Sequence, residues 1–184
     1  MIDIQELSFT ESQEFISVFE FLEKPSFNGM DWVDVEDENA TYIWLLEDIK
    51  KPLGFLSYKI ILMPNQIDFI YIVKIYVLKT HRSKKPILID GKRASMILFE
   101  QIYKKDINIL TLESADEKLD IYYQKLGFKY NVELSKELSK VIDTRNREIM
   151  YKIDKREEIE LSEVEKKFFD SHTPLKFSNS KHRS

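Results

Sequence analysis

The sequence predicts an α+β fold: a central, mixed but mostly antiparallel sheet of about six to seven strands, flanked by about four helices. Two observations predict it. Three strand-like runs follow one another in the middle of the chain with only short turn signals between them, which favours an antiparallel meander. Strand-like and helical runs then alternate, which favours a locally parallel arrangement around the two middle helices.

The first 25 residues predict a strand and then a helix. Residues 2–9, IDIQELSF, have strand character, and Thr10 with Gln13 three positions later forms a capping-box pattern. Pro25 lies just beyond the expected end of the helix. An apolar stripe at i, i+3, i+4, i+7 spacing predicts the buried face of this helix: Phe15, Val18, Phe19 and Leu22.

The predicted meander covers residues 41–49, 52–63 and 67–78, separated by the turn-like segments KKP and PNQ. The third run is the most regular of the three. One of its alternating faces is apolar throughout, and the other is only partly polar. A strand that is apolar on both faces usually lies in the middle of its sheet. We therefore expect residues 67–78 to form the central strand.

The second half of the chain predicts two helices separated by strands. The first helix begins near Ala94 and carries Ile97, Leu98 and Ile102 on one face. Residues 107–114 predict a strand, and Ser114 with Glu117 forms a second capping box. The second helix ends at Gly127 and is expected to bury one stripe: Ala115, Leu119, Tyr122 and Leu126. Residues 128–134 and 147–154 predict the last two strands.

Length and composition predict one domain with an extension. The chain has 184 residues, of which 43% are apolar and 33% are charged, as in soluble globular proteins. We expect residues 1–153 to form the domain and residues 154–184 to form a charged helix and a flexible tail.

Charge and cysteine content exclude several classes of function. The net charge is −4, which argues against nucleic acid as a partner. The chain has no cysteine, which excludes disulfides, thiolate metal sites and cysteine nucleophiles, and its three scattered histidines argue against a zinc site. No export signal is visible, and no apolar run approaches the ~20 residues of a membrane span. We therefore expect a cytoplasmic protein that does not enter the membrane.

A basic strand-to-helix junction, residues 77–95, is the first candidate site. Helix N-termini present unpaired N–H groups and a partial positive charge, and so attract phosphate. The junction carries six Lys and Arg side chains, and five of them follow the turn after the strand and add positive charge there: Arg82, Lys84, Lys85, Lys92 and Arg93. The alternative is a solvated surface loop, since Lys-rich loops are common.

The segment SADEKLDIYYQKLGF, residues 114–128, is the second candidate. Tyr122 falls on the predicted apolar stripe, so we expect it in the core. Tyr123 lies about 100° further around the helix and is expected to face a groove, where its hydroxyl can act as a general acid. The alternative is that both tyrosines serve packing alone.

These two segments and the order of elements resemble the GNAT superfamily of acyl-CoA N-acyltransferases, over roughly residues 2–152. Members commonly carry an Ala, then a Tyr four residues before a Gly-Phe pair, here Ala115, Tyr123, Gly127 and Phe128. The resemblance implies that Tyr123 lies beside the coenzyme A sulfur and protonates the leaving thiolate.

The resemblance also implies a coenzyme loop at the first candidate site. Val77 and Arg82 match the start of the family's pyrophosphate motif, with Lys79 where proline often stands. The glycine-rich part of the motif is missing, because SKKPILIDGKR follows with Gly91 as its only glycine, before Ala94 opens the helix. Cationic side chains would compensate as point charges on the phosphates of acetyl-CoA. The implied coenzyme-binding residues are Ile75, Val77, Lys79, Arg82, Lys84, Lys85, Gly91, Lys92, Arg93 and Ala94.

Two further elements of the implied reaction are less defined. A backbone N–H around Ile75 to Val77 would polarise the thioester carbonyl, as in an oxyanion hole. The carboxylate that many members carry on the central strand has no counterpart at Tyr71 or Ile72. Asp68 or Glu113 would deprotonate the amine through a water. The alternative is that both carboxylates are charges at strand ends with no part in the reaction.

The leading hypothesis is a GNAT-type N-acetyltransferase in which an amine acceptor attacks acetyl-CoA directly, without an acyl-enzyme. Residues 31–38, which are acidic, would attract a cationic acceptor. The alternative is a GNAT-fold protein without transferase activity that binds a partner, with Phe168 and Phe169 in the C-terminal extension as a docking element. A nucleotide- or nucleic-acid-binding module that uses the basic loop is the third hypothesis.

Overall fold

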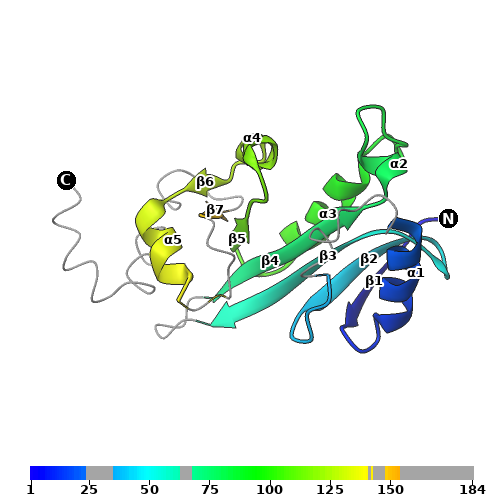
Figure 1. Ribbon diagram of the computed structural model, residues 1–184, viewed down its shortest axis with the longest axis horizontal. Coiled ribbons are helices and arrows are strands. Elements are labelled where there is room, and N and C mark those ends of the chain that lie inside the picture. The colour runs from blue at the N-terminus through cyan, green and yellow to red at the C-terminus, as the bar shows by residue number, and fades with distance from the viewer. Residues whose placement is uncertain (24–34, 63–67, 141, 143–147, 154–184) are drawn as a thin grey trace. The chain divides into compact units, whose positions relative to one another are not determined.

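The computed structural model describes residues 1–23, 35–62, 68–140, 142 and 148–153 (Figure 1). Seven strands form one sheet in the order β1-β2-β3-β4-β5-β7-β6, with β4 at its centre. The strands are β1 (Asp3–Ser8), β2 (Thr41–Asp48), β3 (Lys51–Leu62), β4 (Asp68–Val77), β5 (Ile109–Glu113), β6 (Lys129–Tyr130) and β7 (Ile149–Ile153). The helices are α1 (Gln13–Glu23), α2 (Lys79–Arg82), α3 (Ala94–Tyr103), α4 (Glu117–Lys125) and α5 (Val132–Leu138).

This architecture confirms the predicted fold class. The pairs β1–β2, β2–β3, β5–β7 and β6–β7 are all antiparallel. The predicted central strand, β4, is the fourth of the seven strands. Within the described residues four helices have seven residues or more, and α2 is a single turn.

The described residues belong to two compact units. The first unit combines the described residues of 1–59 and 72–105, and the second combines those of 60–71 and 106–153. Strands β3 and β4 therefore contribute to both units. The proposed extension, residues 154–184, lies outside the described residues.

The core of the first unit is an aromatic cluster between α1 and the sheet. Phe19 of α1 contacts the rings of Trp44, Phe55 and Tyr76 edge-on, at centroid distances of 5.5–6.2 Å. Residues 42–46 of β2 are buried without alternation, so both faces of the sheet are covered there. In Figure 1, α1 lies across the strands β1 and β2.

An ion pair joins α3 to the edge of the sheet in the same unit. The Lys105 ammonium donates to both carboxylate oxygens of Glu6, at 3.0 and 2.7 Å. The Tyr58 hydroxyl also donates to Glu6, at 2.7 Å. This cluster fixes the C-terminal end of α3 against β1 and β3.

The core of the second unit forms around β5, which is buried along residues 109–112. The Thr111 hydroxyl donates to the carbonyl oxygen of Ile70 at 3.2 Å, which links β5 to the first half of β4. The Ile149 N–H donates to the Ser135 hydroxyl at 2.6 Å, which links β7 to α5.

The structure corrects the expected strand at residues 128–134. Only Lys129–Tyr130 is extended, and α5 begins at Val132. The reason is that Glu, Leu and Lys, which dominate residues 133–138, are strong helix formers, and Asn131 is a favourable residue before a helix. The Ser135 N–H indeed donates to the Asn131 carbonyl at 2.9 Å.

Both expected capping boxes are displaced. At the first turn, the Glu11 carboxylate accepts the N–H and hydroxyl of Ser8, each at 2.8 Å, so the reciprocal pair is Ser8–Glu11 and not Thr10–Gln13. At α4 the N-cap is Asp116, whose carboxylate accepts the Leu119 N–H at 2.9 Å. Asp116 directly precedes α4, which begins at Glu117, whereas Ser114 lies two residues further out and its hydroxyl donates to the Asp116 carbonyl at 3.0 Å.

The buried face of α1 also differs from the expected stripe. Its buried residues are Ile16, Phe19 and Glu23, whereas Leu22 is 43% exposed. The buried stripe therefore includes a carboxylate, which apolar periodicity alone does not reveal.

Candidate functional site

Strand β4 changes from fully buried to half-buried along its length. Residues 69–72 are buried, and residues 73–76 are half-buried on both faces of the strand. Of these four residues Val73 and Ile75 are apolar, Tyr76 is aromatic and Lys74 is charged, and the described chain does not cover them fully. Ile75 belongs to this half-buried stretch, while Val77 at its end is 5% exposed.

The backbone of β4 is held closely against β3 at this end. A Cβ atom on Gly54 of β3 would lie 2.7 Å from the carbonyl oxygen of Tyr76 and 3.1 Å from the Cα of Val77. The Leu78 N–H donates to the Leu53 carbonyl oxygen at 2.9 Å, one residue further along. Glycine at position 54 therefore fixes the path of the backbone through residues 76–78.

The turn that follows β4 is held by a carboxylate from α1. The N–H of Lys79 donates to Glu23 Oε1 at 2.9 Å, and Arg82 Nη1 donates to Glu23 Oε2 at 2.8 Å. Arg82 Nη1 also donates to the Val77 carbonyl oxygen at 2.8 Å, and its guanidinium carbon lies 5.0 Å from the centroid of the Tyr76 ring. Arg82 thus binds within the protein, at the position where the resemblance implies a phosphate contact.

Glu23 was missed by the sequence reasoning. Its position four residues after Phe19 places it on the same face of the helix. A carboxylate on a buried face needs a hydrogen-bonding partner, and this position could have pointed to such a contact.

The loop after α2 ends in a two-residue hairpin. The N–H of Ile89 donates to the Lys92 carbonyl, and the N–H of Lys92 donates to the Ile89 carbonyl, each at 2.9 Å. Asp90 and Gly91, between them, have φ values of 49° and 76°. Two positive φ angles on an Asp-Gly pair are typical of a type I′ turn. The conformational freedom of Gly91 therefore serves this turn.

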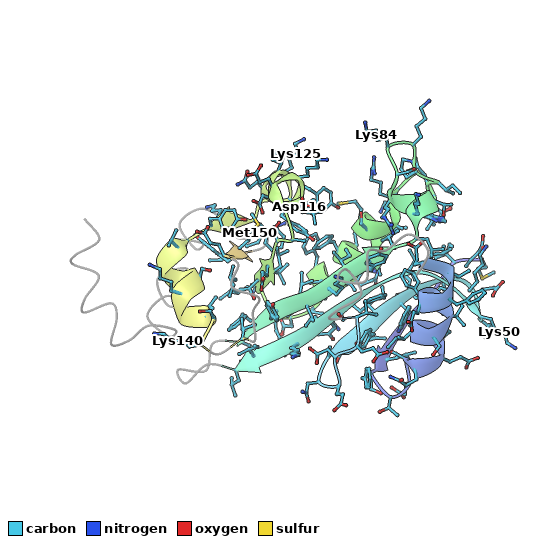
Figure 2. The ribbon with its side chains drawn as sticks, in the orientation of Figure 1. Lys50, Lys84, Asp116, Lys125, Lys140 and Met150 are labelled. Carbon is cyan, nitrogen blue, oxygen red and sulfur yellow. The ribbon has the colours of Figure 1, made fainter. Side chains whose placement is uncertain are left out.

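The basic side chains of the loop fall into two groups. The Lys92 ammonium donates to Glu100 at 2.7 Å and is neutralised there. The side chains of Lys79, Lys84, Lys85 and Arg93 are exposed, and none has a carboxylate partner within the described part of the chain. Figure 2 shows the labelled Lys84 side chain near the tip of the loop above α2.

Helix α3 begins at Ala94, which is fully buried, directly after these cations. Its N-cap is Arg93, whose side chain makes no capping hydrogen bond, and its first turn carries no acidic residue. This end of α3 therefore keeps its partial positive charge beside the exposed basic side chains.

Tyr123 belongs to the second unit, whereas the ten implied coenzyme-binding residues all belong to the first. It lies in the last turn of α4, where the Phe128 N–H donates to the Tyr123 carbonyl and the Gly127 N–H donates to the Gln124 carbonyl, both at 3.0 Å. Gly127 has φ 94°, and the rings of Tyr123 and Phe128 lie 5.9 Å apart. This is a Schellman cap with its apolar contact. The spacing of Tyr, Gly and Phe in the motif is thus the spacing that this cap requires.

The exposure of the two tyrosines is the reverse of the expectation. Tyr123 is 6% exposed, whereas Tyr122 is half-buried. The cap explains the reversal, because it draws Tyr123 against Phe128 and so turns this side of the helix inward. Burial, with smaller contributions from Tyr122 and Asp116, raises the pKa of Tyr123 well above its ordinary value of 10.

The two candidate bases occupy strand ends in the second unit. Asp68 is the first residue of β4, and its Oδ1 is buried without a hydrogen-bond partner within the described part of the chain. Glu113 is the last residue of β5 and is half-buried. Both carboxylates therefore stay candidates for the general base.

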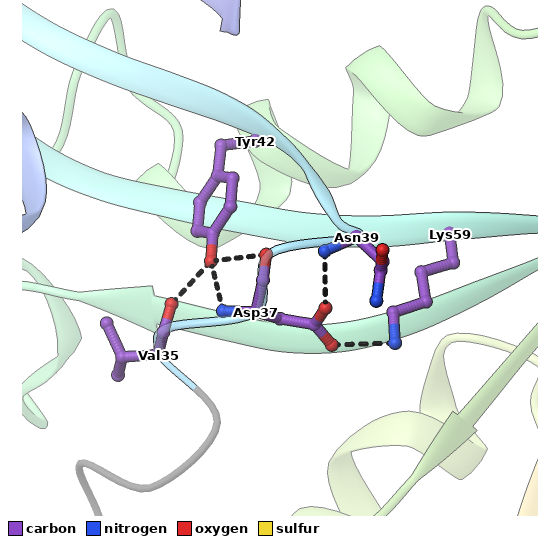
Figure 3. Close-up of polar contacts among 5 residues, drawn as sticks. All are labelled: Val35, Asp37, Asn39, Tyr42 and Lys59. Carbon is purple, nitrogen blue, oxygen red and sulfur yellow. Dashed lines mark hydrogen bonds and ion pairs between the residues drawn. The ribbon is translucent and has the colours of Figure 1, made fainter. Parts of the chain in front are cut away.

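The described end of the acidic segment is firmly anchored in the first unit (Figure 3). The Tyr42 hydroxyl donates to the Val35 carbonyl at 2.6 Å and accepts the Asp37 N–H at 2.9 Å. The Asp37 carboxylate pairs with Lys59 at 2.7 Å and accepts the Asn39 N–H at 2.9 Å. Asp37 is therefore neutralised within the protein, while residues 31–34 lie outside the described residues.

Comparisons with known proteins identify the fold. No family model matches the sequence, and no curated protein matches it. A GNAT-family acetyltransferase from Staphylococcus aureus Mu50 is similar in structure, with a TM-score of 0.56 and 16% identity over 84% of this chain and 100% of that chain. A Klebsiella pneumoniae protein proposed to be an acyl-CoA N-acyltransferase has a TM-score of 0.52 and 16% identity over 83% of this chain and 97% of its own.

A Lactobacillus plantarum protein proposed to be an N-acetyltransferase has a TM-score of 0.51 and 13% identity over 82% of this chain and 97% of its own. The chain therefore has the GNAT fold, as the sequence predicted. None of the helices within the described residues is long and apolar enough to cross a membrane.

Proposed function

Because the chain has the GNAT fold, we propose that it is an N-acyltransferase that transfers an acetyl group from acetyl-CoA to an amine acceptor. One observation carries the proposal: the half-buried end of the central strand, with Val73 and Ile75, leads into a basic loop and then into the N-terminus of α3, whose first turn carries no acidic side chain. A half-buried strand end with apolar side chains suits the pantetheine arm, and the cations that follow suit the phosphates. We expect the reaction to take place in the cytoplasm.

Coenzyme A would be held by the first unit. The pantetheine arm would run beside Ile75 and Val77, where the contact between Gly54 and the β4 backbone fixes the strand. Phosphate groups would contact Lys79, Lys84, Lys85 and Arg93, whose charges have no described partner, and the N-terminal turn of α3. Arg82 and Lys92 would support the loop, because each is already paired with a glutamate.

The reaction would be a direct attack. The acceptor nitrogen would bond to the thioester carbonyl carbon, the C–S bond would break, and the electron pair would leave with sulfur. A backbone N–H around residues 75–77 would stabilise the carbonyl oxygen as it becomes negative. Asp68 or Glu113 would take the proton from the nitrogen through a water, and Tyr123 would donate to the leaving thiolate.

A thermal-shift measurement with acetyl-CoA and with free coenzyme A tests the binding step. A ligand that binds only the native state adds ~2.7 kcal/mol to the unfolding free energy when present at 100 times its Kd. For a chain of this size we expect Tm to rise by roughly 5–10 °C. An unchanged Tm at millimolar concentrations of both ligands would contradict the proposal.

A second candidate function is a GNAT-fold binding protein without transferase activity. The specific observation in its favour is the coenzyme loop, where a type I′ hairpin stands in place of the glycine-rich cradle and two of the six basic side chains bind glutamates. This alternative predicts no amine-dependent release of thiol from acetyl-CoA, whether or not coenzyme A binds.

A further inference from the structure

Glu23 is a buried carboxylate in an unfavourable place. It is 3% exposed and lies in the last turn of α1, on the same face as the buried residues Ile16 and Phe19. The C-terminal turn of a helix carries a partial negative charge, and no basic residue of α1 offsets it there. A carboxylate at this position is tolerated only if other elements supply hydrogen bonds and positive charge.

The junction between β4 and α2 supplies both. Glu23 Oε1 accepts the Lys79 N–H at 2.9 Å, at the start of α2, and Oε2 accepts Arg82 Nη1 at 2.8 Å, at its end. One carboxylate thus holds both ends of a single helical turn. The bond from Arg82 Nη1 to the Val77 carbonyl at 2.8 Å ties the same guanidinium to the end of the central strand.

Helix α2 transmits this constraint to the basic loop. The Thr80 carbonyl accepts the Ile87 N–H at 3.0 Å. This hydrogen bond joins the two ends of the segment that carries Lys84 and Lys85. Beyond it, the hairpin at Ile89 and Lys92 leads into α3, which contacts α2. The position of the unpaired cations therefore depends on α2, and α2 depends on Glu23.

We propose that Glu23 is a positioning residue for the phosphate-binding loop and sets the affinity for the phosphate end of coenzyme A. This inference rests on the proposed function. Glu23 does not contact the ligand and acts through Arg82 and the Lys79 N–H. The alternative is that the Glu23 carboxylate competes with the phosphates for the Lys79 N–H and the Arg82 guanidinium. If Glu23 positions the loop, its replacement should weaken the binding of coenzyme A. If Glu23 competes with the phosphates, its replacement should tighten that binding.

The experiment is a calorimetric titration of the wild type, Glu23→Gln and Glu23→Asp with coenzyme A and with pantetheine, which lacks the phosphates. In Glu23→Gln the charge is lost and one acceptor oxygen becomes an NH₂ donor facing Lys79 or Arg82. We expect its Kd for coenzyme A to rise about threefold to tenfold. Its Kd for pantetheine should stay within about twofold of the wild type, because the substitution leaves the half-buried end of β4 intact.

Glu23→Asp keeps the negative charge but is one methylene too short to reach both donors. We expect the same direction of change with a smaller amplitude, and this variant carries the test if Glu23→Gln does not fold. Glu6→Gln is the matched control, because Glu6 also joins a lysine and another donor in the first unit but lies outside the loop. It should leave both dissociation constants unchanged.

Three results would overturn the proposal: tighter binding of coenzyme A, equal weakening of coenzyme A and pantetheine, or no change in either. Equal weakening would mean that Glu23 supports the unit as a whole. If the wild type binds neither ligand, the proposed function itself fails. If the wild type binds both and the Glu23 variants match it, only this inference fails.

Discussion

At the scale of single residues, the state of the Tyr123 hydroxyl decides what chemistry it can perform. Burial raises its pKa above 10, so it stays protonated throughout the neutral range. A thiol has an ordinary pKa of about 8.5, so full proton transfer from this phenol to a thiolate is uphill. Tyr123 would therefore stabilise the leaving sulfur mainly by donating a hydrogen bond, until water supplies the proton.

Replacement of Tyr123 by Phe tests this role. The variant keeps the ring contact with Phe128 and the backbone cap, so we expect the Tm and the affinity for coenzyme A to stay close to those of the wild type. Turnover should fall by about 10²-fold or more, because the donor is lost. Tyr122→Phe, one position away and half-buried, should keep full turnover. Equal turnover of Tyr123→Phe and wild type would remove Tyr123 from the mechanism.

Tyr42 has a different buried hydroxyl, one that anchors residues 35–37. Burial raises its pKa to about 12. In the unfolded chain the phenol ionises near pH 10, whereas the folded protein keeps it neutral up to about pH 12. The unfolded state therefore binds fewer protons between these values, and stability that is fully present below pH 10 is lost as the pH rises toward 12.

Tyr42→Phe should reveal this dependence in urea unfolding at pH 8, 10 and 11. At pH 8 we expect the variant to be less stable by about 1–3 kcal/mol, because the Asp37 N–H and the Val35 carbonyl lose their partner. Above pH 10 the difference should shrink by at most about 1.4 kcal/mol per pH unit, and by less where solvent screens the hydroxyl. A difference that stays constant to pH 11 would contradict the pKa assigned to Tyr42.

The local geometry of candidate residues was predictable where a motif lies within one helix end. Tyr123, Gly127 and Phe128 are spaced as a Schellman cap, so the motif fixes their arrangement within one helix end. Which tyrosine of the pair is buried follows from the same cap, because the ring of Tyr123 packs against Phe128, whereas apolar periodicity alone pointed to Tyr122. Glu23 was not predictable as the partner of Arg82, because 58 residues of chain separate them.

At the scale of elements, the close approach of β3 and β4 at Gly54 shapes the candidate site. Any side chain at position 54 would collide with backbone atoms of Tyr76 and Val77, which have no freedom to move aside within the sheet. The end of β4 that is proposed to bind pantetheine therefore takes its path from the absence of a side chain at position 54 of the neighbouring strand.

Gly54→Ala should destabilise the protein by about 1–3 kcal/mol in urea unfolding and weaken coenzyme A binding, because β4 has to shift. Ser57→Ala is a matched change on the same strand. The Ser57 hydroxyl is buried without a hydrogen-bond partner within the described residues, so its removal should be neutral or slightly stabilising. A Gly54→Ala variant as stable as Ser57→Ala would show that β3 and β4 are not closely packed there.

The longer elements were predictable, and the connections were less so. Strands β2, β3 and β4 fall where alternating apolar residues and turn signals place them. The short β6 and α5 were misjudged, because a few apolar residues near Tyr130 suit either a strand or a helix. The single turn α2 and the hairpin at Asp90 and Gly91 depend on contacts with Glu23 and α3, which local patterns do not encode.

At the scale of the whole molecule, the fold is shared with proteins that are only 13–16% identical to this chain. Such a fold needs only the order of elements and their apolar patterns, which the sequence preserves. Activity needs specific loops, and here the basic loop after β4, proposed to bind coenzyme A, departs from the glycine-rich pattern. The fold alone therefore does not distinguish an acyltransferase from a binding protein, and the distinction depends on the loop and on Tyr123.

Amine-dependent release of thiol from acetyl-CoA is the most direct test of acyl transfer. The measurement uses the full chain with aminoglycosides, polyamines, peptides with free N-termini and lysine-containing peptides, and a sample without amine as reference. We predict release above the reference with at least one of these classes, together with an acetylated product heavier by one acetyl group. Release equal to the reference with every class, from a protein whose Tm rises with coenzyme A, would contradict the transferase account and favour a binding protein.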